Sequence, residues 1–109
     1  MDSSDAEIDS RRLHHELEHA IKEINKEQIS IAAGVLKRED FIQVAQMVAC
    51  LRARYISNIL ELAKRSGPTC IDTESALELK SLREAYQEAL TGFDALEHAL
   101  KREYVTFSA

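Results

Sequence analysis

The sequence predicts an all-α protein built from three long helices. Gly and Pro together account for four of the 109 residues, and 30% of the residues are charged. So few turn residues disfavour a many-stranded β domain. Apolar residues instead recur at steps of three and four over three long segments, which is the spacing of one helical face. We expect an antiparallel helical hairpin plus a third, coiled-coil-like helix, folded as a three-helix bundle.

The chain length allows one domain and argues against two. We expect an acidic, flexible N-terminus over residues 1–8 and a single helical domain over 9–107, with helices at about 7–34, 39–66 and 73–105. No apolar run approaches the roughly 18 residues that span a bilayer. The first residues are acidic where a signal peptide is basic. A soluble, cytoplasmic protein with no membrane partner is therefore expected.

The first helix extends from about Glu7 to about Gly34. Glycine is poor inside a helix and suits the position just past its end, so we place a tight turn over residues 34–38. The apolar residues that define its expected inward face are Leu13, Leu17, Ala20, Ile21, Ile24, Ile31 and Val35.

The second helix carries two apolar stripes side by side. One stripe contains Phe41, Val44, Val48, Leu51, Tyr55 and Leu62. The other contains Ile42, Ala45, Ala49, Ile56, Leu60 and Ala63. A helix that is apolar over so wide an arc is buried against more than one partner, so we expect it at the centre of the fold. Gly67 and Pro68 end it, because Gly adopts the left-handed conformation and Pro cannot continue a helix.

The third helix opens at Asp72 or Thr73, either of which can cap the first-turn amides. Its apolar residues alternate steps of three and four over about three heptads, which is the seam of a coiled coil. Such a seam packs against its own hairpin or against another subunit. Because long helices in so small a chain bury modest surface, we expect a homo-oligomer. The candidate oligomer or partner seam is Leu79, Leu82, Tyr86, Ala89, Phe93, Leu96 and Leu100.

The formal net charge of -5 is unevenly distributed. Residues 1–34 and 67–109 each carry four bases against eight acids, whereas residues 35–66 carry six bases against three acids. A basic middle helix between two acidic ones favours their packing on one another, and it also offers phosphate contacts to nucleic acid. The candidate nucleic-acid contacts are Lys37, Arg38, Arg52, Arg54, Lys64 and Arg65.

The sequence predicts no complete catalytic site. Cys-x-x-Cys, Gly-x-Ser-x-Gly and a phosphate-binding Gly-rich loop are absent. The string His15-Glu16-Leu17-Glu18-His19 has the His-Glu-x-x-His spacing, but its two histidines are expected in solvent, so we expect a non-enzymatic protein without cofactors. His15 and His19 are weak metal-ligand candidates four residues apart. They lie far around the helix from Leu13 and Leu17, so we expect them in solvent and expect no metal site. Cys50 is expected to be a small, reduced core residue.

One stretch resembles a known family. It contains a Gly-x-Leu turn after a long charged helix, an acidic pair that opens the next helix, and an apolar run into a Leu-Arg-Ala-Arg segment. This pattern is similar to the helical region of bacteriophage DNA-packaging proteins of the terminase small-subunit type, over about residues 11–65. The matching positions are Gly34 and Leu36, Glu39 and Asp40, and Leu51-Arg52-Ala53-Arg54.

The resemblance implies a non-enzymatic subunit that forms a multimer in the bacterial host cell, recognises double-stranded viral DNA and presents it to the large terminase subunit. In that family an N-terminal winged helix-turn-helix domain reads DNA, and here an acidic segment of about ten residues precedes the hairpin. We therefore expect oligomerisation and sequence-independent DNA contact. Two alternatives stay open. One is a chaperone or adaptor that holds a partner's helix on the third helix, and the other is a metal-binding, ferritin-like bundle.

Overall fold

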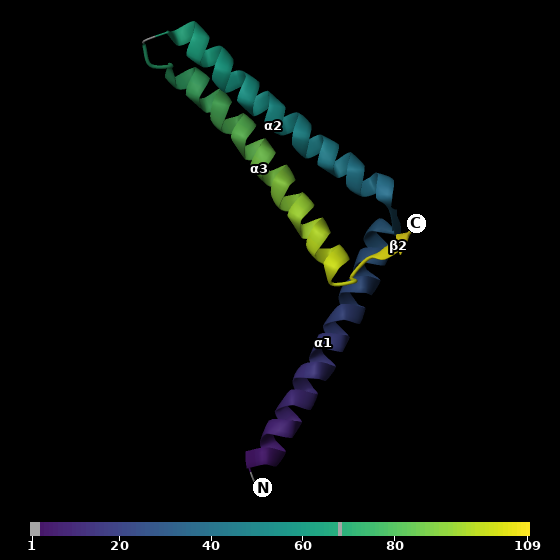
Figure 1. Cartoon of the computed structure of the whole chain (residues 1–109). Helices are drawn as coiled ribbons and strands as arrows, with labels where there is room; N and C mark the ends of the chain where they lie inside the picture. The colour runs from purple at the N-terminus through teal and green to yellow at the C-terminus, as the bar shows by residue number, and fades with distance from the viewer. Residues whose placement is uncertain (1–2, 68) are drawn as a thin grey trace. The chain divides into compact units, whose positions relative to one another are not determined.

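The computed structural model describes residues 3–67 and 69–109, and most of them are helical. Three long helices, α1 (Ser3–Ala33), α2 (Arg38–Ser66) and α3 (Thr73–Lys101), follow one another along the chain (Figure 1). Two short strands, β1 (Val35–Lys37) and β2 (Thr106–Ser108), complete the regular structure of the described residues. The prediction of an all-α fold with three long helices is confirmed.

The contacts divide the chain into two units, which are described separately. One unit joins Met1–Lys37 to His98–Ala109, and the other is Arg38–Glu97. The first unit thus contains α1, both strands and the last turn of α3. The second contains α2 and nearly all of α3.

The second unit is an antiparallel hairpin, in which α2 and α3 run side by side (Figure 1). The less exposed positions of each helix alternate steps of three and four, as in the seam of a coiled coil. On α2 they are Phe41, Val44, Val48, Leu51, Tyr55, Asn58 and Leu62; on α3 they are Ser75, Leu79, Leu82, Tyr86, Ala89, Phe93 and Leu96. The core is thin, because in this unit only Val48 and Leu62 are classed as buried among the described residues.

Both predicted turns begin at a glycine in the left-handed conformation. Gly34 has φ 71° and its amide donates to the carbonyl of Ser30 at 2.8 Å. Gly67 has φ 58° and its amide donates to the carbonyl of Ala63 at 3.2 Å. A side chain would be strained at these φ values, so glycine is the residue that ends each helix with least cost.

The start of α3 is set by Asp72. Its Oδ1 accepts a hydrogen bond from the amide of Ser75 at 2.7 Å, which satisfies one of the unpaired amides of the first turn. This hydrogen bond is also the largest cause that lowers the pKa of the Asp72 carboxyl, since it favours the ionised form. Of the two predicted caps, Asp72 is the one the structure uses.

Two predicted helix limits are corrected. α1 begins at Ser3, within the segment expected to be flexible, and α3 ends at Lys101 instead of about 105. The earlier end of α3 follows from Glu103, which has φ 59°. Beyond it, the amide of Tyr104 donates to the carbonyl of Ala99 at 2.8 Å, the hydrogen bond that closes a helix after a left-handed residue.

The C-terminal segment packs on the end of α1. β1 and β2 pair in parallel, with Val35 opposite Thr106 and Lys37 opposite Ser108. Lys22 Nζ contacts Glu103 Oε2 at 2.6 Å, and Val105 is buried. The two strands were not expected from the sequence, because three-residue segments are too short to leave a periodic pattern.

Candidate assembly and nucleic-acid surfaces

Within its own unit the apolar stripe of α1 is exposed, so this unit does not provide the inward packing expected for the stripe. Leu13 is 56% exposed, Leu17 50%, Ile24 58% and Ile31 74%. Within its own unit the helix is shielded instead along the side that carries Lys22, Lys26 and Ile29. At 100° per residue this side lies about 150° around from the stripe. The C-terminal segment therefore covers the side of α1 that carries Lys22 and Lys26, and it leaves the apolar stripe exposed.

An acidic row borders the α1 stripe. Asp9, Glu16 and Glu23 occur at every seventh position, each one residue before a position of the stripe's heptad pattern, and all three are exposed. In a coiled coil, residues at such flanking positions contact the flanking residues of the partner helix, and their charges determine which helix can pair. The α1 surface thus combines an uncovered apolar stripe with a negative border.

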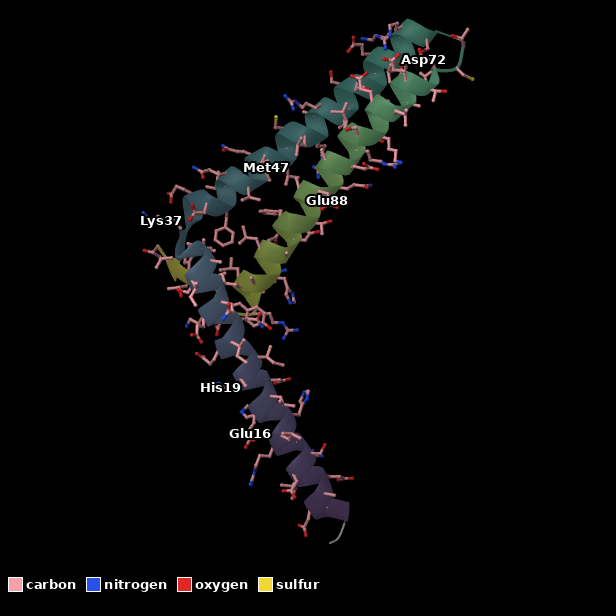
Figure 2. All side chains as sticks on the ribbon, turned by 180° about the vertical axis from the view of Figure 1, so that it is seen from behind. Glu16, His19, Lys37, Met47, Asp72 and Glu88 are labelled. Atoms are coloured by element: carbon pink, nitrogen blue, oxygen red, sulfur yellow. The ribbon has the colours of Figure 1, made fainter. Side chains whose placement is uncertain are left out.

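The second apolar stripe of α2, which we call the outer stripe, is also exposed. To the six residues predicted from the sequence it adds Ala53, which lies on the same side of the helix. Its members, all exposed, are Ile42, Ala45, Ala49, Ala53, Ile56, Leu60 and Ala63. Figure 2 shows that α2 side chains project away from α3 as well as toward it. A shallow groove along this face is lined by Ala53, Ile56, Ser57, Leu60, Glu61 and Lys64. Within the Arg38–Glu97 unit α3 covers only the first stripe of α2, so this unit alone does not supply the second partner that the sequence predicted.

The seam predicted on α3 faces α2 within the hairpin. Six of its seven residues, from Leu79 to Leu96, lie in the shielded row described above, and Leu100 is 39% exposed. Arg52 of α2 crosses to this row, because its Nε donates to the Tyr86 hydroxyl at 3.0 Å. The Arg52 guanidinium carbon also lies 5.2 Å from the centre of the Tyr86 ring, a cation–π contact. This cross-helix contact was not foreseen from the sequence.

The six basic candidates do not share one face. Arg54 and Arg65 are eleven residues apart and lie on the same side of α2, whereas Arg52 lies about 160° away and is held by Tyr86. Glu61 lies between Arg54 and Arg65 on their side of the helix. Arg38, Arg54, Lys64 and Arg65 are exposed, as is Lys37 in β1. Arg54 and Arg65 therefore share one side of α2 about 16 Å apart along the helix, Lys64 lies about 100° around from Arg65, and the other bases lie elsewhere.

Asn58 is the polar member of the shielded α2 row. Its side-chain oxygen is buried and has no hydrogen-bond partner among the described residues. Asn58 lies three residues after Tyr55 and four before Leu62, so it continues the steps of three and four that define the shielded row. This spacing is the sequence signal that could have assigned Asn58 to the face toward α3. Cys50, expected in the core, is exposed, because it lies on the polar side between the two stripes.

The histidines do not form a metal centre in the structure. His15 and His19 are exposed on α1. Their neighbour His14 contacts Glu18 at 2.9 Å, one turn further along. Across residues 3–67 and 69–109, no group of three or more His, Cys, Asp or Glu side chains is placed to hold a metal ion.

One ion pair in the first unit changes the acidity of both partners. Hydrogen bonding to Glu103 raises the pKa of Lys22, and the same contact lowers the pKa of Glu103. Both side chains are exposed, so solvent screens the interaction and its contribution to stability is small. The pair lies where the C-terminal segment meets the polar side of α1.

No protein-family model, curated protein or solved structure matches the chain. None of the helices in the described ranges combines the length and the apolar character needed to cross a membrane. The fold and its surfaces define a class of protein, one of long helices with two apolar stripes that no other element of the same unit covers.

Proposed function

We propose that this chain is a non-enzymatic helical subunit that works as an assembly of several copies and assists the packaging of viral DNA, as terminase small subunits do. The observation that carries the proposal is the amount of exposed apolar surface. Among the described residues, sixteen large apolar side chains are exposed and three hydrophobic residues are buried. Contiguous apolar surface of this kind marks an interaction surface in a soluble protein.

The free energy available from burying the exposed apolar side chains favours assembly. Burying the exposed half of a Leu or Ile side chain contributes about 1 kcal/mol, so the stripe of α1 alone offers roughly 5 kcal/mol per copy. That is comparable with the whole unfolding free energy of a small domain, about 5 to 15 kcal/mol. A chain that leaves this much stabilisation unused as a monomer gains it by association.

The DNA part of the proposal rests on the family resemblance and on the exposed bases Arg54 and Arg65. Two phosphate contacts predict an affinity for double-stranded DNA that falls with salt, with a logarithmic slope of about -2. No aromatic row accompanies these bases, so contact with the phosphate backbone is the mode that their chemistry fits.

The test is a mobility shift of a double-stranded DNA fragment with the full chain, at several salt concentrations. Arg54→Glu combined with Arg65→Glu is expected to abolish the shift. The matched control is Arg11→Glu with Arg12→Glu, which makes the same charge change on α1 and is expected to retain most of it. Absence of a shift at low salt, or an equal loss in both double variants, contradicts the DNA contact.

A second candidate function, an adaptor that holds a partner's helix, is favoured by the border of the α1 stripe. The acidic row of Asp9, Glu16 and Glu23 suits an amphipathic helix with basic flanks. An adaptor of this kind is a monomer that binds one partner and has no DNA affinity. The surface that would hold the partner's helix is the α1 stripe, because the α3 seam already faces α2.

A further inference from the structure

We infer that the outer stripe of α2 is a self-association surface, on which the α2 helix of a second copy packs antiparallel about a two-fold axis near Arg52 and Ala53. This inference rests on the proposed function, because it specifies one contact of the proposed assembly. It concerns the Arg38–Glu97 hairpin alone, and it needs no contribution from the other unit.

The first argument is the order of large and small residues along the stripe. In a two-fold symmetric contact, a residue on one copy faces the residue placed symmetrically on the other. Every symmetric pair of the stripe then joins one large side chain to one alanine, which is how facing positions interdigitate in a packed core. The pairs are Ile42 with Ala63, Ala45 with Leu60, and Ala49 with Ile56.

The second argument is the exposure of the stripe. Ile42 is 42% exposed, Ile56 48% and Leu60 56%, so each large member still has surface to bury. The stripe covers 21 residue steps from Ile42 to Ala63, a length of about 32 Å on a helix. The shallow groove beside Ala53, Ile56 and Leu60 lies in the C-terminal half of the outer stripe. In the antiparallel pair this half faces the N-terminal half of the partner's outer stripe, where the small residues lie.

The third argument is the charge at the two ends of α2. Glu39 lies in its first turn and Lys64 in its last turn. They are 25 residues apart, which brings them within about 20° of each other on one border of the stripe. Antiparallel packing therefore sets Glu39 of each copy against the partner's Lys64, an attraction between opposite charges at each end of the contact. Arg52, the base nearest the axis, is turned to its own Tyr86.

The swap experiment tests the facing pairs. Ala49→Ile places two isoleucines opposite each other and is expected to weaken self-association of the full chain about tenfold or more. The double variant Ala49→Ile with Ile56→Ala restores one large and one small residue in each pair, so it is expected to regain most of the lost affinity. Circular dichroism checks that both variants remain helical. A double variant as weak as, or weaker than, Ala49→Ile overturns the inference.

A cysteine trap tests the register independently. In full-length protein carrying Cys50→Ser and Cys70→Ser, Ala53→Cys is expected to form a disulfide-linked dimer on mild oxidation. The neighbouring Arg54→Cys, on the opposite side of the helix, is expected to form much less. Equal yields overturn the inference. If the chain still has the mass of an oligomer in that case, the proposed assembly stands and another surface carries it; if the chain is a monomer, both fail.

Discussion

The residues that end the helices show how closely single side chains set this fold. Gly34, Gly67 and Asp72 were all expected at helix limits from their chemistry, and each lies where that chemistry is used. Glu103 was not expected, because a glutamate gives no sequence signal for a left-handed conformation. Cys50 was expected in the core and is exposed, whereas Asn58, whose position was not predicted from the sequence, lies in the shielded row of α2. Neighbouring residues lie 100° apart on a helix, so a small shift in the assigned face changes which residue is buried.

Asp72 gives a prediction at this scale. Asp72→Ala is expected to lower the melting temperature of the protein at pH 7 by a few degrees, because the first turn of α3 loses its cap, whereas Asp72→Asn retains a capping oxygen and most of the stability. The folded-state pKa of Asp72 is lowered, so its ionised form contributes fully above the unfolded carboxyl pKa of about 3.9. That contribution is lost as the pH falls through the folded pKa.

The measurement is thermal unfolding followed by circular dichroism across pH. The difference between the wild type and Asp72→Ala is expected to shrink below about pH 4 as the carboxyl is protonated. An unchanged melting temperature for Asp72→Ala at pH 7 would show that the hydrogen bond to Ser75 does not stabilise α3.

At the scale of elements, periodicity predicted the helices and left open which faces meet. Steps of three and four located α1, α2 and α3 and both stripes of α2, because local spacing alone determines an amphipathic face. The same spacing cannot tell a covered stripe from an uncovered one. In this chain the row with Val48 and Leu62 is shielded and the row with Leu60 is exposed. The pairing of β1 with β2 joins segments about 70 residues apart in the sequence and has no local signal.

Leu62 and Leu60 offer a matched pair of substitutions on one helix. Leu62 is 3% exposed, so Leu62→Ala is expected to lower the unfolding free energy by about 2 to 5 kcal/mol. Leu60→Ala is expected to leave helix content nearly unchanged and to weaken self-association instead. Chemical denaturation and light scattering on both variants separate the two effects. Equal loss of helix stability in the two variants would contradict the assignment of an inner and an outer stripe.

At the scale of the whole molecule, the uneven distribution of charge and the small core have a common explanation. A chain of three long helices with three buried hydrophobic residues among those described has a small core, and this favours the proposed association. The acidic α1 and the basic α2 present different surfaces, so different contacts within an assembly become selective. An oligomer is expected from the sequence through chain size, and the exposed stripes are the surfaces that we propose form its contacts.

The mass of the full chain in solution tests this account most directly. Size-exclusion chromatography with light scattering at micromolar concentration is expected to give an integer multiple of 12.3 kDa, two or more. Leu17→Glu, which places a charge in the α1 stripe, and Ala49→Ile, which crowds the outer stripe, are each expected to lower that mass. A mass of 12.3 kDa at every concentration examined, with the helices intact, would contradict the proposed assembly.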